Sequence, residues 1–233
     1  MKTNLQTVNL EELRRVTMLR GLAEADVQQL SEQLHVKVFP ANTPLMAAEQ
    51  PGETVYFIAS GAVKVHAEQA DGRDVLIAIL GPSEIVGEMS VFGASQRSAS
   101  VHTLEATKLY WTDRATFQRW LKTIPLLAFN LGEILAARLR HANEQIQALA
   151  ALDTEGRVAR QLLNFAERYG QPGSERDVYI PIRLTQSDIA ALVGATREHT
   201  NKILVSYKER GYLSTNQSYH FTLHNPRALA QRC

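Results

Sequence analysis

The stretch QSDIAALVGATREHTNKI, Gln186–Ile203, has the pattern of two short helices joined by a tight turn. Three aliphatic residues fall on the face that would point inward in such a hairpin: Ile189, Val193 and Ile203. Ala190 is small where two helices would cross closely. Gly194 occupies the turn, where a positive φ is needed, and Thr196 can cap the second helix. The stretch therefore predicts a helix-turn-helix.

Polar side chains cover the first turns of the second helix: Arg197, Glu198, Asn201 and Lys202. An arginine matches the O6 and N7 acceptors of guanine, and a glutamate can accept from cytosine N4. Other residues lie where they could hold phosphates, a role without sequence information: Thr185, Gln186, Ser187, Thr196 and His199. We therefore expect a recognition helix for the major groove. The alternative is a charged, solvated helix of an all-α domain.

Thr200 departs from this pattern, because it occupies a position where an aliphatic residue usually packs inward. We expect its side chain to be partly exposed or hydrogen-bonded to its own helix.

The net charge of +1 is unevenly distributed along the 233 residues. Residues 1–152 hold 14 basic and 16 acidic residues, whereas residues 153–233 hold 11 and 8. The C-terminal part is therefore the basic one, which agrees weakly with nucleic-acid binding there.

Upstream, short segments rich in β-branched and aromatic residues follow one another: His35–Phe39, Thr54–Ser60, Val63–Gln69, Asp74–Leu80, Ser100–Thr103 and Lys108–Trp111. Turn residues separate them, and Asp71-Gly72 between two alternating runs predicts a hairpin. Many short strands at regular spacing favour an antiparallel sandwich or barrel. The amphipathic stretch Leu10–Leu34 before them predicts a helix.

A long helix is predicted from Pro125 to Leu152, with a narrow apolar seam whose members step by four and three residues: Leu135, Leu139, Ala142, Ile146 and Leu149. This spacing is typical of a coiled coil and predicts a parallel homodimer. The alternative is a core helix packed on its own domain.

Asp153 can cap a further helix, Thr154–Tyr169, which precedes a strand at Val178–Arg183 and a hairpin at Tyr212–Leu223. The chain is thus expected to be an α+β protein with three parts. These are an antiparallel β-roll over residues 1–124, a dimerisation helix over residues 125–152, and a winged helix-turn-helix over residues 153–233.

The stretch VGEMSVFGASQRSASV, Val86–Val101, combines features of an anion site. Gly87 allows close approach of a backbone, and Glu88–Phe92 can form a helical turn whose N–H groups point at an anion. Arg97 could form a charge-assisted pair with a phosphate. Glu88 would repel a phosphate but could accept a hydrogen bond from a sugar hydroxyl, so the set indicates a nucleotide. The alternative is a Glu88–Arg97 ion pair that stabilises the loop.

With both motifs, the chain resembles the cyclic AMP receptor protein / fumarate-nitrate regulator superfamily of bacterial transcription factors, from about Leu19 to Leu229. The nucleotide motif is Gly87-Glu88 followed by Arg97-Ser98-Ala99, and the DNA-reading motif is Arg197-Glu198 with Lys202. The order of the three parts is also that of the superfamily.

The resemblance implies a role for each residue of the nucleotide site. Gly87, Ser98 and Arg97 would bind the cyclic phosphate, and Glu88 the ribose 2′-hydroxyl. Further residues implied at or near the nucleotide are Val86, Met89, Ala99 and Arg138.

The residues implied at the base are Ala142 and Asn143, which replace a Thr-Ser pair that contacts adenine in cyclic-AMP-dependent members. Ala142 cannot make that hydrogen bond, whereas Asn143 could serve adenine or guanine. The resemblance implies cyclic AMP as the effector, and this substitution leaves cyclic GMP or another nucleotide as alternatives.

Enzyme activity and metal binding are not expected. A metal-dependent enzyme of this sheet class needs clustered ligands, and the histidines are dispersed along the sequence: His35, His66, His102 and His141. Cys233 is the only cysteine, so intrachain disulfides and the cysteine-dependent oxygen-sensing branch are excluded. Two alternatives remain, a regulator of the same fold that needs no nucleotide or takes a different small ligand, and a nucleotide sensor that acts through protein partners.

The expected partners are a palindromic double-stranded DNA site and a second copy of the chain. The loop Gly170–Asp177 is either a contact for RNA polymerase or a plain solvated loop. No membrane is expected, because the longest strongly apolar run, Val75–Leu80, is far shorter than the roughly 20 residues of a membrane span. We expect a cytoplasmic protein.

Overall fold

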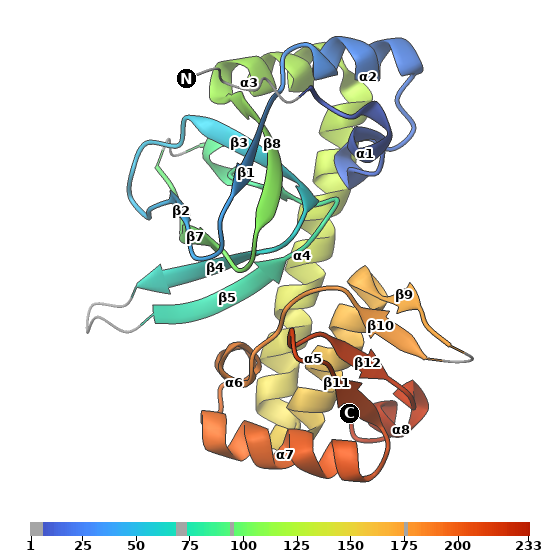
Figure 1. Ribbon diagram of the computed structural model, residues 1–233. Helices are drawn as coiled ribbons and strands as arrows, with labels where there is room; N and C mark the ends of the chain where they lie inside the picture. Colours follow the sequence, from blue (N-terminus) through green and yellow to red (C-terminus); the bar gives the residue numbers. More distant parts are fainter. Residues whose placement is uncertain (1–6, 69–73, 94–95, 175–176) are drawn as a thin grey trace. The chain divides into compact units, whose positions relative to one another are not determined.

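The computed structural model describes residues 7–68, 74–93, 96–174 and 177–233 (Figure 1). These residues form two compact units, Met1–Arg138 (unit 1) and Leu139–Cys233 (unit 2). The boundary falls inside the long helix α4, Pro125–Ala151, so that both units include part of this helix.

Unit 1 contains two four-stranded antiparallel sheets, with strand orders β1-β8-β3-β6 and β2-β7-β4-β5 (Figure 1). The strands are β1 (His35–Phe39), β2 (Pro44–Met46), β3 (Thr54–Ser60), β4 (Val63–Glu68), β5 (Asp74–Leu80), β6 (Ile85–Val86), β7 (Ser100–Thr103) and β8 (Thr107–Asp113). The expected antiparallel β-roll is confirmed. Strands β2 and β6 were not predicted, because two or three residues are too few to show an alternating pattern.

Strands β4 and β5 pair in antiparallel register, with Val63 opposite Leu80 and Glu68 opposite Asp74. The predicted turn residues Asp71-Gly72 lie outside the described residues. The pairing of the two strands agrees with the predicted hairpin.

One hydrophobic core of unit 1 lies between the β1-β8-β3-β6 sheet and the helices, and a second is formed by residues of both sheets. Phe57 of β3 and Tyr110 of β8 are buried in the first core with Phe117 of α3 (Arg114–Thr123). Leu127 and Leu131 of α4 are buried in the same core. The reading of α4 as a helix packed on its own domain is therefore correct for its first turns.

The expectation of one helix over Leu10–Leu34 was wrong. The segment forms three short helices: α1 (Leu10–Arg14), η1 (Thr17–Leu19) and α2 (Glu24–Ser31). Gly21 has a φ of +78°, which ends helical geometry between η1 and α2. The side-chain amide of Asn130 on α4 donates to the carbonyl oxygens of Met18 and Arg20 at 2.9 and 2.8 Å, and so anchors this segment.

Unit 2 combines helices with a small antiparallel sheet of order β11-β12-β10-β9. Its elements after α4 are α5 (Thr154–Tyr169), β9 (Gln171–Pro172), β10 (Val178–Ile180), α6 (Gln186–Val193), α7 (Arg197–Glu209), β11 (Leu213–Thr215), β12 (Phe221–Leu223) and α8 (Pro226–Ala230). The predicted helices and hairpin agree with these bounds, and Asp153 caps α5 as expected. Strand β9 and helix α8 were not predicted.

Within the described residues, no single helix is both long and apolar enough to cross a membrane. Helices α3 and α4 meet that criterion only as a pair, and the pair is bent by 109°.

A polar cluster joins α1 to the sheet of unit 1. The Glu12 carboxylate accepts hydrogen bonds from Lys108 Nζ and the Tyr110 hydroxyl, both at 2.7 Å. These two bonds lower the pKa of Glu12 from its ordinary value. The ionised carboxylate therefore stabilises the folded state above the pKa it has in the unfolded chain, and this contribution is lost as the pH falls through the lower folded pKa.

We expect Glu12→Gln to lower the free energy of unfolding near neutral pH by about 0.5–1 kcal/mol, because the pair is partly exposed. The difference from the wild type should shrink as the pH falls from about 6 to about 3. Urea unfolding of both proteins across this range measures it. Glu11→Gln, an exposed neighbour on α1, is the matched control. A difference that is constant with pH would contradict the assignment.

Candidate ligand site and nucleic-acid interface

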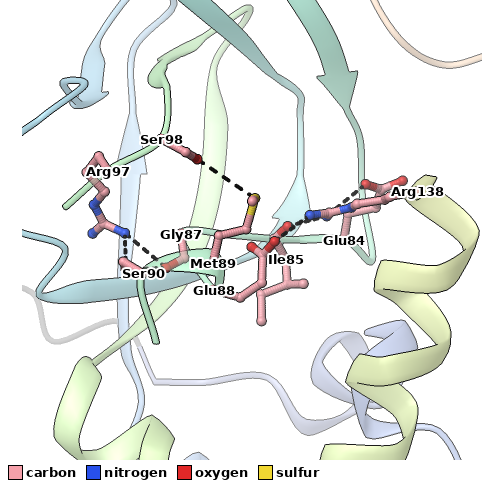
Figure 2. Close-up of polar contacts among 9 residues, drawn as sticks. All are labelled: Glu84, Ile85, Gly87, Glu88, Met89, Ser90, Arg97, Ser98 and Arg138. Carbon is pink, nitrogen blue, oxygen red and sulfur yellow. Dashed lines mark hydrogen bonds and ion pairs between the residues drawn. The ribbon is translucent and has the colours of Figure 1, made fainter. Parts of the chain in front are cut away.

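Arg97 is a buried cation whose hydrogen-bond partners among the described residues are all neutral oxygens. Its side chain is 9% exposed. Nη1 donates to the Gly87 carbonyl oxygen at 3.0 Å and to Ser90 Oγ at 3.2 Å, and Nη2 donates to the Thr54 carbonyl oxygen at 2.6 Å (Figure 2). Burial lowers the pKa of Arg97 from its ordinary value. Among the described residues, no carboxylate lies within ion-pair distance of this guanidinium, so no ion pair neutralises its charge there.

Gly87 is the point of closest backbone approach in this site. Its φ is +90°, a conformation that favours glycine. A Cβ atom on this residue would lie 2.7 Å from Arg97 Nη1 and 2.8 Å from the Thr54 carbonyl oxygen. The prediction that Gly87 permits a close approach is therefore supported, and the first neighbour to use that space is the Arg97 side chain.

Glu88 lies at the start of the short 3-10 helix η2 (Met89–Val91) and is only 2% exposed. Its carboxylate accepts from Arg138 Nη1 at 2.7 Å. Arg138 Nη2 donates in addition to the Ile85 carbonyl oxygen at 2.5 Å and lies 3.5 Å from Glu84 Oε2. Figure 2 shows Arg97 and Arg138 on opposite sides of the segment from Gly87 to Met89. The alternative of a Glu88–Arg97 ion pair is thus wrong, because Arg138 is the partner of Glu88.

The remaining residues predicted at the phosphate lie on the same segments. Ser98 is exposed, and its hydroxyl contacts the sulfur of Met89 at 3.8 Å (Figure 2). Val86 is buried at the end of β6, and Ala99 is half-buried just before β7. Unit 1 therefore brings together the predicted residues from Val86 to Ala99 and Arg138.

Thr54, Ser90 and Glu84 belong to this polar network but were not predicted. Thr54 contributes its backbone carbonyl oxygen. Every residue has this group, so the sequence cannot indicate such a contact. Ser90 bonds Arg97 from the η2 turn, and Glu84 lies beside Arg138. Glu84 lies only a few residues before the Gly-Glu motif. This position beside the predicted nucleotide segment was the one sequence signal that could have identified it as part of the network.

The other predicted ligand residues, Ala142 and Asn143, lie in unit 2 on α4, where both are exposed. The predicted dimer seam shares this helix. Leu139 and Ile146 are each 64% exposed, and Leu149 is exposed as well. Leu135 differs, because it is half-buried against the core of unit 1. An exposed apolar stripe therefore begins at Leu139.

The predicted helix-turn-helix is present in unit 2 as α6 and α7. Gly194 has a φ of +65° in the turn, as expected. Thr196 Oγ1 accepts from the backbone N–H of His199 and caps α7. Three aliphatic side chains are buried between the helices as predicted: Ile189, Val193 and Ile203.

The side chains that would face DNA are solvent-accessible. Arg197, Glu198, His199 and Lys202 are exposed, and Asn201 is half-buried. At the start of α6, Ser187 is exposed and Gln186 half-buried. Thr185 is different, because its hydroxyl forms a capping box with Asp188 and so already has a protein partner.

The expectation for Thr200 was wrong. Its side chain is fully buried, and its hydroxyl has no hydrogen-bond partner among the described residues. The methyl group fills the inward position of α7, where an aliphatic side chain would also fit. The side chain of Thr200 is therefore buried by packing, although its hydroxyl loses a hydrogen bond.

Two histidines that are far apart in sequence meet in the structure. His66 on β4 and His102 on β7 lie with Nε2 and Nδ1 2.7 Å apart, because the two strands are neighbours. The description of the histidines as dispersed is thus wrong for this pair. Within the described ranges, no group of three or more potential ligands could hold a metal ion.

A Ser–His–Asp row lies on the sheet of unit 2. His224 Nδ1 is 2.9 Å from Asp177 Oδ2, and His224 Nε2 is 2.9 Å from Ser214 Oγ. His224 is separated from Asp177 by 47 positions and from Ser214 by 10, so no local sequence motif indicated this row. The row joins the strand ends of β10, β11 and β12, and we assign it a structural role.

The fold also corrects the predicted Gly170–Asp177 loop, since its first part forms β9; residues 175–176 lie outside the described residues.

Comparison with known proteins agrees with both regions. Residues 36–123 match the cyclic nucleotide-binding domain family, and residues 156–232 match the Crp-like helix-turn-helix domain family. A CRP-like cAMP-activated global transcriptional regulator of Mycobacterium tuberculosis is 36% identical over 204 residues, which cover 87% of this chain and 90% of the relative. The cyclic AMP receptor protein of Thermus thermophilus is 29% identical over 194 residues, with coverages of 83% and 86%.

The fold is also found in solved structures. FixK2 from Bradyrhizobium japonicum superposes with a TM-score of 0.73 at 20% identity, covering 85% of this chain and 96% of FixK2. The Mycobacterium tuberculosis relative is named as a transcriptional regulator and not as an enzyme. The chain belongs to the cyclic AMP receptor protein / fumarate-nitrate regulator family and is a DNA-binding transcription regulator with a cyclic nucleotide-binding domain.

Proposed function

We propose that the chain is a homodimeric transcription regulator whose DNA binding is controlled allosterically by cyclic AMP. The observation that carries the effector site is the buried Arg97 guanidinium, whose partners in the described part of the chain are all neutral. A cyclic phosphate would supply the missing negative charge in a place where water screens it little. The relatives named as cAMP-activated support cyclic AMP as the nucleotide.

In this proposal, Gly87, Arg97 and Ser98 hold the phosphate, and Glu88 accepts from the ribose 2′-hydroxyl. Glu88 and its partner Arg138 link the site to α4, because Arg138 lies on that helix. Val86, Met89 and Ala99 would form the pocket wall. Ala142 would lie beside the base, and Asn143 would read it. Asn143 carries both a donor and an acceptor, so it suits the adenine edge without the Thr-Ser pair.

The exposed stripe on α4 supports the homodimer. Leu139, Ala142, Ile146 and Leu149 step by three and four residues along a continuous helix, and each is exposed in the single chain. Burying such a stripe against a second copy removes its apolar surface from water. Nucleotide binding would then alter the coiled coil, and the junction at Leu152–Thr154 would reorient the recognition helices to sites about 34–36 Å apart on DNA.

On DNA, Arg197, Glu198, Asn201 and Lys202 are proposed to read bases of a palindromic site with GTG/CAC-like steps. Gln186, Ser187, Thr196 and His199 would hold phosphates. Thr185 would not join them, because its hydroxyl and its backbone N–H both bond Asp188. Action in the cytoplasm and contact with RNA polymerase through residues 170–177 stay predictions.

A regulator that needs no nucleotide is the second candidate. One observation favours it: the hydrogen bonds of Arg97 and the ion pair of Glu88 form entirely within the protein. Such a protein would bind its DNA site equally well with and without cyclic AMP.

Removing the proposed phosphate ligands should weaken cyclic AMP binding. We expect Arg97→Gln to lower the affinity by about 100-fold or more, and Ser98→Ala by about tenfold, because charge-assisted and neutral hydrogen bonds to the phosphate are removed. Isothermal titration of the full chain with cyclic AMP measures both. Arg15→Gln, an exposed arginine on the N-terminal segment, controls for the change in charge.

Arg97 also holds three protein oxygens, so thermal melting of Arg97→Gln must accompany the titration. Ser98 is exposed, and its substitution should leave the melting temperature unchanged. Wild-type affinity in both variants would contradict the phosphate assignment. DNA binding by a wild type that takes up no cyclic AMP would favour the nucleotide-independent regulator.

The seam can be tested by placing a charge in it. We expect sedimentation velocity to show a dimer for the wild type and a dimer at least about 100-fold weaker for Leu139→Glu, because a carboxylate would be buried in an apolar interface. Ala137→Glu on the opposite side of α4 adds the same charge outside the seam and should leave the dimer intact. A monomeric wild type, or equal dimers in both variants, would refute the seam.

A further inference from the structure

A small cleft in unit 2 lies where the last turns of α4 meet α5 and α6 (Figure 1). Apolar side chains of α4 and α6 line it together with a polar stripe of α5. The stripe consists of Arg157, Arg160, Gln161 and Asn164, whose spacing places them on one face of the helix. The enclosed volume is about 20 Å³, and one side of the cleft is open to solvent. None of these residues belongs to the proposed nucleotide site or to the proposed DNA-reading set.

Gln161 is a buried carboxamide that has no bonding partner in the described part of the chain. The residue is 7% exposed, and its side chain forms no hydrogen bond with any described residue. Three apolar neighbours on α5 are fully buried: Val158, Leu162 and Phe165. A leucine at position 161 could pack without the cost of an unbonded buried amide. Because Gln161 lines the cleft, a molecule bound there can supply the missing partner.

The cleft is positively charged. Two guanidinium groups line it, whereas no carboxylate of the described residues does. The Arg157 guanidinium is held by the protein, since Nε donates to the Val193 carbonyl oxygen at 2.8 Å and Nη1 to that of Leu152 at 3.0 Å. Arg160 is different, because its Nη2 lies 3.7 Å from Glu144 Oε2, an ion pair too long for a hydrogen bond. Its N–H donors are therefore available to an anion in the cleft.

These groups match the chemistry of a small carboxylate. The planar fork of a guanidinium donates two parallel hydrogen bonds to a carboxylate, and Arg160 has this fork available. The amide groups of Gln161 and Asn164 can donate to the remaining oxygen lone pairs. Ala148 and Leu192 offer an apolar surface for a short alkyl chain. The enclosed volume has room for about one water-sized group, which suits a carboxylate head and excludes a nucleotide.

We propose that this cleft binds a short monocarboxylate, such as acetate or propionate. Arg160 holds the carboxylate together with the side-chain amides of Gln161 and Asn164, and the alkyl chain lies against Ala148 and Leu192. The ligand thereby connects α5 with α4 and α6. The site requires neither nucleotide control nor dimer formation, so it can be tested separately from the proposed function.

The test is proton–nitrogen NMR of the isotopically labelled full chain, titrated with sodium acetate that replaces sodium chloride at constant ionic strength. The side-chain amide signal of Gln161 is identified by its loss in Gln161→Leu. We expect this signal to shift along a saturating curve. Arg160→Gln should lower the affinity at least about tenfold, because charge-assisted hydrogen bonds are removed. Arg227→Gln, at an exposed arginine of α8, makes the same change in charge and should keep wild-type affinity.

Thermal melting separates ligand binding from a structural role of the stripe. Without acetate, Gln161→Leu should melt at the wild-type temperature or above it, because the variant no longer buries an unbonded amide. Acetate should raise the melting temperature of the wild type and not that of Gln161→Leu, because only a folded protein with the intact site binds it. Arg160→Gln should keep the wild-type melting temperature, since its ion pair is partly exposed.

Two results would overturn the carboxylate site. The first is a Gln161 signal that shifts linearly with acetate, or that saturates equally in Arg160→Gln. The second is a Gln161→Leu variant that melts well below the wild type, which would assign the amide a structural role.

Discussion

A guanidinium buried without a carboxylate partner is the constraint on which the ligand site depends. Removing the Arg97 charge from water is costly, and three neutral oxygens from β3, Gly87 and η2 offset that cost only in part. The same bonds fix the path of the chain from Gly87 to Ser90, since Gly87 has no room for a side chain beside Nη1. An anion bound beside Arg97 would supply the negative charge that the described residues do not provide.

Glu88 connects the ligand site to helix α4. Its buried carboxylate is held by Arg138, the last residue of unit 1, on a helix that continues into unit 2. In the proposed mechanism, a ribose hydroxyl shares Glu88 with Arg138, so ligand binding acts on α4 through a single ion pair. A coupling of about 1–3 kcal/mol is enough for a switch.

Much of the fold could be predicted because its signals are local. Gly194 and Thr196 mark the turn and cap of the helix-turn-helix, and Asp153 marks the start of α5. Features that depend on distant pairing could not be predicted. The His66–His102 contact follows from the pairing of β4 with β7, and the Arg138–Glu88 pair joins residues fifty positions apart. Thr200 was misjudged because burial of its methyl group outweighed the need of its hydroxyl for a partner.

Control of DNA binding by the nucleotide is tested by comparing the affinity for DNA with and without cyclic AMP. Anisotropy of a labelled duplex with two inverted TGTGA half-sites, separated by a spacer of about six base pairs, measures it at fixed salt. We expect saturating cyclic AMP to raise the affinity by at least about fivefold, and up to about 150-fold. Equal, tight binding in both conditions would contradict nucleotide control and identify a dimer that is competent without its effector.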